Sequence, residues 1–349
     1  MRILTIVGAR PQFIKSYPVS RAFTRCGVDE VTLHTGQHFD RGMSDIFFEE
    51  LGLPQPGYRL DINSGSHGEM TGRMLAAIEQ VLLDNAFDAV LVYGDTNSTL
   101  AGALAAAKLC IPVIHVEAGL RSYNRTMPEE VNRVMADHVS DLLLCPTADS
   151  IANLKREGIT KNVLHVGDVM FDATLLAEPI AKAHSGILDT LGVAPGAYAI
   201  ATVHRADNTA DADALDRVLA YIAETAGKTP VILAAHPRTR KAAEQFGIPL
   251  ERGPIRAVEP LGFLDMCRLM ADATMLFTDS GGMQKEAYFH RIPCITLRSE
   301  TEWPETLDAG WNRLWSQPEF AAPRTDISDY GTGEAAGKCG AAILDWFNA

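Results

Sequence analysis

The feature that most constrains the fold of this chain is the regular alternation of short apolar runs with longer segments of helical period. The short runs are rich in β-branched residues, which is typical of strands buried on both faces of a parallel sheet. Parallel strands need crossover connections, and the stretches at 68–83 and 99–109 have the spacing of crossover helices. The pattern therefore predicts an α/β protein with parallel sheets.

The alternation occurs twice along the 349 residues, a length that suits two domains. Strands are predicted first at residues 3–7, 30–33, 89–92, 113–116, 142–144 and 163–166, and after Gly167 at 198–203, 230–234, 273–277 and 294–297. We predict two Rossmann-like domains, 1–167 and 168–333. A further helical pattern at 334–349 could cap either half.

Charge narrows the range of ligands. Lys and Arg number 31 against 44 Asp and Glu, a net charge of −13. This balance opposes general binding to nucleic acid or to anionic membranes. Any bound phosphate must therefore meet locally placed cations.

Cysteine usage and hydropathy predict the compartment. The six cysteines are scattered without CxxC spacing, so neither a zinc site nor a disulfide framework is indicated. The first apolar stretch is too short for a signal-peptide core, and no run of 18 apolar residues follows. We expect a soluble cytoplasmic protein.

Ligands of open α/β sheets bind beyond the carboxyl ends of the strands, so the loops there are the first places to examine. The loop after the first strand, 8–15 (GARPQFIK), contains neither G-x-G-x-x-G nor a Walker pattern, which excludes dinucleotide and P-loop sites of those types. Arg10 and Lys15 near a helix N-terminus suit a sugar or phosphate anion. The alternative is a plain turn with solvated charges.

A second polar loop, 93–99 (YGDTNST), follows an apolar strand. Asp95 could cap the next helix, because Asp, Asn and Ser are favoured there. Asn97 or Ser98 could do the same, which would leave Asp95 available for proton transfer.

The third segment runs from 115 to 133. Glu117 at a strand end and Glu129 at a helix start could face one pocket, where paired carboxylates acquire different pKa values and act as acid and base. The competing interpretation is that Pro128, Glu129 and Glu130 only form a favourable helix N-terminus, and we favour it for Glu130.

Two further loops belong to the second half. His204 and Arg205 follow a strand and suit contact with a diphosphate, although a lone His is more often structural. His236 after the next strand is a weaker candidate.

The last polar loop opens a helix with Ser280, Gly281 and Gly282. The backbone N–H groups of this helix start can approach a phosphate closely, and Glu286 one turn later can accept hydrogen bonds from ribose hydroxyls. We predict a nucleoside-diphosphate site here.

Taken in order, these blocks resemble the non-hydrolysing UDP-N-acetylglucosamine 2-epimerases. The resemblance implies a glycosyltransferase-B-like fold with the active site in the interdomain cleft, UDP held mainly by the second domain, and a C-terminal helix that returns to the first. It also implies a homodimer.

The resemblance further implies roles for single residues. Positions matching catalytic ones are Asp95, Glu117, Glu129 and His204; positions matching substrate-binding ones are Arg10, Lys15, Arg133, Ser280, Gly281, Gly282 and Glu286. We add Arg205 for its place beside His204. The implied route eliminates UDP to give a 2-acetamidoglucal and adds UDP back after proton delivery to the other face of C2. No hydride moves, so no nicotinamide is needed, and no metal is expected because arginines and helix N-termini can stabilise the leaving charge.

We therefore predict an isomerase acting on UDP-N-acetylglucosamine for the biosynthesis of a surface polysaccharide. Gln12 lies where members acting on UDP-N-acetylglucosamine commonly carry Glu, and the loop at 121–128 differs from their usual version. The segment at 8–13 (GARPQF) looks more like the branch acting on UDP-2,3-diacetamido-2,3-dideoxyglucuronate. Arg125 could then pair with a C6 carboxylate. Three further functions stay open at this point: a glycosyltransferase, a hydrolysing relative and a catalytically silent nucleotide-sugar-binding regulator.

Overall fold

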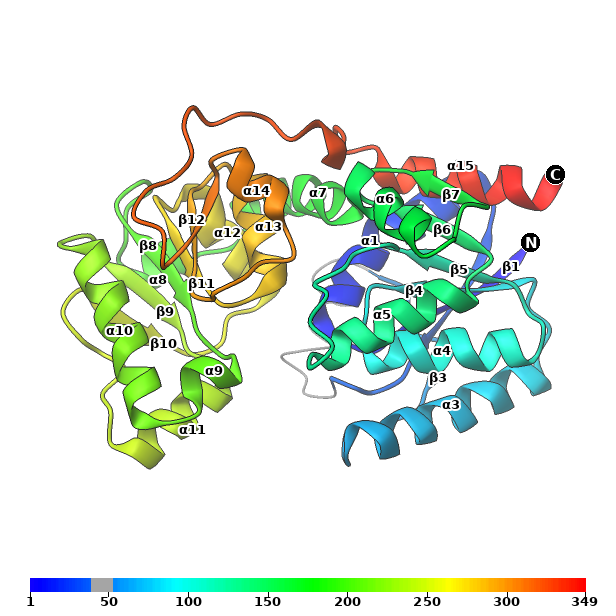
Figure 1. Cartoon of the computed structure of the whole chain (residues 1–349), viewed down its shortest axis with the longest axis horizontal. Coiled ribbons are helices and arrows are strands. Elements are labelled where there is room, and N and C mark those ends of the chain that lie inside the picture. The colour runs from blue at the N-terminus through cyan, green and yellow to red at the C-terminus, as the bar shows by residue number, and fades with distance from the viewer. Residues whose placement is uncertain (39–52) are drawn as a thin grey trace. The chain divides into compact units, whose positions relative to one another are not determined.

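The structure is a computed structural model that describes residues 1–38 and 53–349. The chain forms two compact units (Figure 1). Unit 1 comprises Met1–Leu175 and Ser328–Ala349, and unit 2 comprises Leu176–Ile327. The first division lies inside helix α7 (Val169–His184) rather than at Gly167, because this helix continues from one unit into the other.

Unit 1 contains a parallel sheet of seven strands in the order β3-β2-β1-β4-β5-β6-β7. Its strands are β1 (Arg2–Val7), β2 (Asp29–His34), β3 (Tyr58–Arg59), β4 (Ala89–Tyr93), β5 (Val113–Val116), β6 (Leu142–Cys145) and β7 (Val163–His165). The helices wholly within this unit are α1 (Arg10–Cys26), α3 (His67–Asp84), α4 (Asn97–Lys108), α5 (Pro128–Val139), α6 (Ala148–Arg156) and α15 (Ala335–Asn348), with a 3₁₀ turn at Ser328–Tyr330.

The core of unit 1 follows from the two-residue period of its strands. Leu4 and Ile6 of β1 point to the same face and pack against Met74 and Ile78 of α3 and against the alanines of α4. Helices α3, α4 and α5 lie next to one another over this face (Figure 1). Helix α15 packs on α1, so the C-terminal segment belongs to unit 1.

Unit 2 contains a parallel sheet of six strands in the order β10-β9-β8-β11-β12-β13. Its strands are β8 (Ala199–Thr202), β9 (Val231–Ala234), β10 (Ile255–Val258), β11 (Leu276–Thr278), β12 (Cys294–Thr296) and β13 (Asn312–Leu314). Its helices are α8 (Ile187–Leu191), α9 (Ala206–Thr209), α10 (Ala212–Ala226), α11 (Pro237–Phe246), α12 (Phe263–Asp272), α13 (Gly281–Phe289) and α14 (Pro304–Asp308).

Both faces of the second sheet are covered. Ala199 and Ala201 face a cluster built with α10, while Ile200 between them faces a cluster built with α8 and α12. Two parallel sheets, each with helices, confirm the predicted α/β class with two Rossmann-like halves. The strands that the apolar pattern did not predict, β3, β10 and β13, all lie at sheet edges, where less apolar surface is buried.

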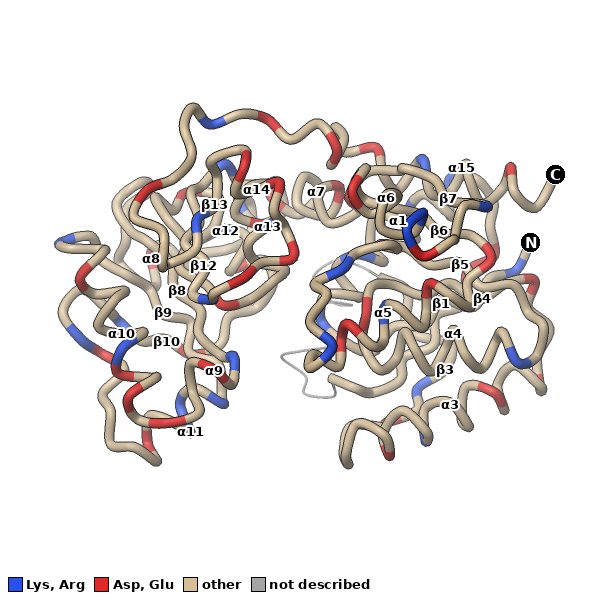
Figure 2. Tube along the Cα trace, in the orientation of Figure 1, with Lys and Arg blue, Asp and Glu red and all other residues tan. Residues whose placement is uncertain are grey.

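The described residues also show how charge is distributed and whether any helix could span a membrane. Basic residues are interspersed among acidic ones along both units (Figure 2). None of the described helices combines the length and apolar character needed to cross a membrane.

Candidate active site

Three neighbouring strands carry the unit 1 candidates. Strands β1, β4 and β5 are adjacent, and the carboxyl end of each leads into one candidate segment. Lys15 lies on α1 after β1, Asp95 follows β4, and Glu117 follows β5. The Lys15 Nζ atom pairs with Glu117 Oε2, and both residues are buried. The fold therefore joins residues that are far apart in the sequence.

The backbone at this edge is adapted to the carboxylate of Glu117. Gly94 has a φ of 61°, and a Cβ atom there would lie 3.1 Å from Glu117 Oε2 and 3.6 Å from Lys15 Nζ. Glycine permits this approach. Glu117 itself has a φ of 69°, a left-handed conformation that costs a residue with a side chain about 1–3 kcal/mol and persists only where the surrounding structure holds it.

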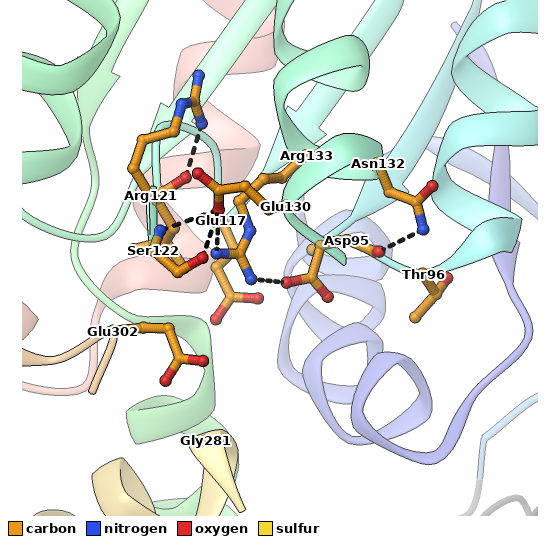
Figure 3. Close-up of polar contacts among 12 residues, drawn as sticks. Asp95, Thr96, Glu117, Arg121, Ser122, Glu130, Asn132, Arg133, Gly281 and Glu302 are labelled. Carbon is orange, nitrogen blue, oxygen red and sulfur yellow. Dashed lines mark hydrogen bonds and ion pairs between the residues drawn. The ribbon is translucent and has the colours of Figure 1, made fainter. Parts of the chain in front are cut away.

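Asp95 is held by a guanidinium group. Arg133 of α5 donates from Nη2 to Asp95 Oδ2 and from Nη1 to Glu130 Oε2, the latter over 2.9 Å (Figure 3). The Asp95 backbone carbonyl also accepts from Asn132 Nδ2 at 2.9 Å. Asp95 does not cap α4, because Thr96 is the N-cap and its hydroxyl accepts from the Thr99 N–H. The carboxylate of Asp95 is therefore not occupied by helix capping.

Glu130 does more than begin a helix. It lies in the first turn of α5, as we predicted, but it is 3% exposed. Its carboxylate accepts from the N–H and hydroxyl of Ser122, each at 2.9 Å, and from the N–H of Tyr123 at 2.8 Å (Figure 3). Glu130 thus connects the loop after Glu117 to Arg133.

The other unit 1 candidates lie at helix starts. Arg10 is half-buried at the start of α1, where its backbone N–H donates to His38 Nδ1 at 3.0 Å. Glu129 is half-buried in the first turn of α5 and precedes Arg133 by four positions, so both lie on the same face of that helix.

In unit 2, His204 is paired with a carboxylate that our sequence reasoning did not single out. Asp279, fully buried at the end of β11, lies 3.1 Å from His204 Nδ1 and accepts from the backbone N–H groups of His204 and Arg205. Burial raises the pKa of Asp279, but the hydrogen bonds and charge of His204 and the amide of Asn208 outweigh it, so the pKa is lowered overall.

Helix α13 presents the predicted anion site. Ser280 is its N-cap, and Gly281 and Gly282 form its first turn, where backbone N–H groups have no partners within the helix. A Cβ atom on Gly282 would lie 3.8 Å from Glu286 Oε1, so the Glu286 carboxylate lies beside this turn. Trp303 Nε1 donates to the Gly281 carbonyl at 2.9 Å and fixes the turn.

Glu302 is a second charged residue that sequence reasoning missed. A Cβ atom on Gly281 would lie 3.4 Å from its carboxylate, and Arg205 Nη2 lies 4.0 Å from it. Arg298 donates to the same carboxylate at 2.9 Å. Burial raises the pKa of Glu302, but Arg298 and Arg205 together outweigh burial, so the net direction of the pKa is down. The start of α13 is therefore surrounded by charges that are largely balanced.

Lys15 is paired with Glu117 and Arg133 with Asp95 within unit 1, and His204 is paired with Asp279 within unit 2. In the part of the chain that the structure describes, no group of three or more His, Cys, Asp or Glu side chains is arranged to hold a metal ion.

Comparison with known proteins identifies the family. Residues 21–336 match the sequence profile described as UDP-N-acetylglucosamine 2-epimerase. This chain belongs to that family. It is 50% identical over 319 residues to a UDP-N-acetylglucosamine 2-epimerase homolog of Methanococcus maripaludis, covering 90% of this chain and 88% of the relative. It is 49% identical, with the same coverage, to UDP-2,3-diacetamido-2,3-dideoxy-D-glucuronate 2-epimerase of Pseudomonas aeruginosa.

A solved member of the family has the same fold. The crystal structure of Methanocaldococcus jannaschii UDP-GlcNAc 2-epimerase in complex with UDP-GlcNAc and UDP matches with a TM-score of 0.91 and 41% identity, covering 99% of this chain and 100% of that one. The predicted family is thus confirmed by sequence and by structure.

Proposed function

We propose that this chain is a non-hydrolysing UDP-N-acetylglucosamine 2-epimerase that interconverts UDP-GlcNAc and UDP-ManNAc. The observation that carries the proposal is two ion pairs at the carboxyl ends of the unit 1 strands: Lys15 with Glu117, which is buried, and Arg133 with Asp95, which is partly exposed. The chain that carries these carboxylates belongs to the same family as the Methanocaldococcus jannaschii enzyme, which was crystallised with UDP-GlcNAc and UDP. The same family includes the diacetamido-glucuronate enzyme of Pseudomonas aeruginosa.

The sugar C2 hydrogen is not adjacent to a carbonyl, so direct deprotonation at C2 is unfavourable. In the proposed anti elimination, a base takes this proton, the C1–C2 double bond forms, and the bond from C1 to the UDP oxygen breaks. The 2-acetamidoglucal then receives a proton at C2 on the opposite face while UDP adds back to C1. Asp95, Glu117 and Glu129 supply the acid and base groups, because carboxylates in different surroundings can exchange protons in both directions.

Unit 2 retains the leaving group in this proposal. The N–H groups at Gly281 and Gly282, with Arg205 and Ser280, bind the diphosphate, because a helix N-terminus and a guanidinium favour negative charge. Glu286 binds the ribose, and His204, which is paired with Asp279, donates a proton to the departing phosphate oxygen in this proposal. Neither a nicotinamide nor a metal is required, because no hydride is transferred and these groups meet the developing charge.

The decisive experiment uses deuterated water. The protein is incubated with UDP-GlcNAc, and the recovered UDP-sugars are analysed for deuterium at C2 and for UDP-ManNAc. Exchange at C2 without net loss of UDP-sugar supports epimerisation. Accumulation of UDP with free N-acetylmannosamine indicates a hydrolysing enzyme. Unchanged substrate that still binds indicates a silent nucleotide-sugar-binding regulator, and sugar transfer that needs an acceptor indicates a glycosyltransferase.

The second candidate substrate is UDP-2,3-diacetamido-2,3-dideoxyglucuronate. The identity of 49% to the Pseudomonas aeruginosa enzyme exceeds the 44% to the Methanocaldococcus jannaschii UDP-N-acetylglucosamine 2-epimerase. Arg125 is exposed in the loop between Glu117 and Glu129, where a guanidinium could pair with a C6 carboxylate.

Turnover of both sugars is compared in the original protein, in Arg125→Ala, and in Arg217→Ala as a control on the exposed side of α10. This candidate is supported if the original protein prefers the glucuronate and if the preference falls in Arg125→Ala but not in Arg217→Ala. Equal turnover of both sugars, or an unchanged preference in Arg125→Ala, contradicts it.

Assembly and compartment complete the proposal. The family resemblance favours a homodimer, and the scattered cysteines favour a reducing cytoplasm where the product would supply surface polysaccharide synthesis. Light scattering coupled to gel filtration tests the first point, since a mass equal to a single chain contradicts it. Cell fractionation tests the second.

A further inference from the structure

His115 of β5 is fully buried and forms hydrogen bonds through both ring nitrogens. Nε2 lies 2.7 Å from the backbone carbonyl oxygen of Gly94, and Nδ1 lies 2.7 Å from Asp137 Oδ1 on α5. A carbonyl oxygen can only accept. The protonation of the ring therefore depends on whether Asp137 is ionised.

Asp137 is a carboxylate. Apart from His115, its Oδ2 atom accepts hydrogen bonds from Arg121 Nη1 at 2.7 Å and from the Gly119 N–H at 3.1 Å, and such donors stabilise the ionised form against the cost of burial. An ionised carboxylate also only accepts. Because both partners of the His115 ring are acceptors, both ring nitrogens carry hydrogen, and the side chain is an imidazolium.

The buried charges balance one another. Asp137 Oδ2 accepts from Arg121 Nη1 at 2.7 Å, and Arg121 binds Glu157 through Nε and Nη2, each at 2.7 Å. Two cations and two anions thus alternate from His115 to Glu157. An imidazolium in this place is stabilised without being exposed to water.

The imidazolium lies between the two turns that carry the unit 1 carboxylates. Gly94 directly precedes Asp95, and its carbonyl is bound by His115. Asp137 accepts from the N–H of Gly119 at 3.1 Å, just beyond Glu117. The hydrogen-bonded pair of His115 and Asp137 therefore holds the backbone on two sides. His115 holds Gly94, just before Asp95, and Asp137 holds Gly119, two residues after Glu117.

We propose that His115 is a positioning residue, a buried imidazolium which, held by Asp137, sets the turn of Asp95 against the turn of Glu117. Its ring is fully buried, so in this proposal it acts through the two turns. The catalytic part of this inference rests on the proposed epimerase function, whereas the protonation of His115 does not. A histidine that merely fills the core would be neutral, and its replacement would change stability without changing turnover.

The protonation state is measured in the unaltered protein. Nitrogen-15 NMR of labelled histidines should show one imidazole with both nitrogens protonated from about pH 6 to pH 8, and its signals should be lost in His115→Gln. His138, whose side chain is 45% exposed, provides an internal comparison. A single neutral tautomer for His115 at about pH 7 overturns the proposal, whatever the enzyme acts on.

The kinetic test compares His115→Gln with His138→Gln. Gln removes the charge at position 115, and turnover should fall by about 10–100-fold, the range found for residues that orient groups in an active site, while KM and UDP affinity remain unchanged. His138 bonds to the far end of the same network, 3.1 Å from Glu157 Oε2, and its replacement should alter neither kcat nor KM. Unreduced kcat in a folded His115→Gln protein contradicts the positioning role. If this variant does not fold, the NMR result decides.

The two proposals fail in different ways. If the unaltered protein neither exchanges C2 hydrogen nor forms a second sugar from either candidate substrate, the proposed function is wrong, and the NMR spectrum still decides the state of His115. If exchange is normal but His115 is neutral, only the present inference is wrong.

Discussion

The Nδ1 atom of His204 lies 3.1 Å from Oδ1 of the buried carboxylate of Asp279. Because a carboxylate accepts only, it holds a hydrogen on Nδ1 and leaves Nε2 as the atom that can exchange a proton with substrate. The pair is formed within unit 2, between the loops after β8 and β11.

Replacing Asp279 with Asn should therefore impair turnover more than binding. The amide can donate to Nδ1 and select the other tautomer, so we expect kcat to fall by about 10–100-fold. The measurement is kcat and KM across pH, with UDP affinity from calorimetry. Asp216→Asn, at an aspartate with a 53% exposed side chain, is the control. Equal losses in both variants, or a loss confined to UDP affinity, would contradict the role of Asp279.

Removing Lys15 should leave a buried charge without its partner. Lys15→Met preserves the side-chain volume but leaves the Glu117 carboxylate buried without its cation. Loss of one member of a buried ion pair lowers the free energy of unfolding by about 3–5 kcal/mol. Urea denaturation measures the change in free energy of unfolding. The double variant Lys15→Met with Glu117→Gln should recover much of the stability and none of the activity. Additive stability losses in the double variant would show that the two residues are not coupled.

Replacing Gln12 with Glu tests whether this chain accepts the carboxyl residue that is common at this position in the family. Gln12 is fully buried, its Nε2 donates to the Tyr93 carbonyl at 2.9 Å and its Oε1 accepts from the Gly8 N–H at 2.8 Å. Gln12→Glu loses the donor, so the Tyr93 carbonyl faces a carboxylate and the free energy of unfolding should fall by about 1–3 kcal/mol. Gln245→Glu on the exposed side of α11 should be neutral in the same denaturation assay. Unchanged stability of Gln12→Glu would mean that this environment accepts a carboxylic acid.

His290 should make stability depend on pH below neutrality. Burial lowers its pKa to about 4, although Glu178 at 3.7 Å raises it in part. Since the unfolded pKa is about 6.5, the unfolded chain binds the proton more tightly, and stability present above that pH is lost as pH falls towards the folded value, by about 3 kcal/mol in total.

The measurement is urea denaturation at several pH values in the original protein and in His290→Gln. The variant should show a smaller loss of stability between neutral and acidic pH, whatever its absolute stability. His184→Gln, at an exposed position of α7, should retain the original slope. Parallel pH curves for His290→Gln and the original protein would overturn this assignment.

Much of the fold could be predicted because it is encoded locally. The apolar runs that became β1, β4, β5 and β8 are buried on both faces, so their composition identifies them without knowledge of their neighbours. The edge strands β3 and β13 escaped prediction because they are short and contain few apolar residues, although Asn312 and Arg313 of β13 are buried. The helix start at Gly281 and Gly282 could also be recognised, because the motif that marks it is local.

The sequence by itself determined the α/β class, the loops of the proposed site and the resemblance to the epimerase family. Tertiary structure decided which groups in those loops are partners. Glu130 has the local pattern of a helix start, yet its carboxylate binds Ser122 and Tyr123, and His115 has the pattern of a strand residue, yet it joins Gly94 to Asp137. Helix and strand patterns depend on residues a few positions apart in the sequence. These contacts instead depend on which segments the crossover connections bring together and on how deeply the side chains are buried, and neither can be recognised from a local pattern.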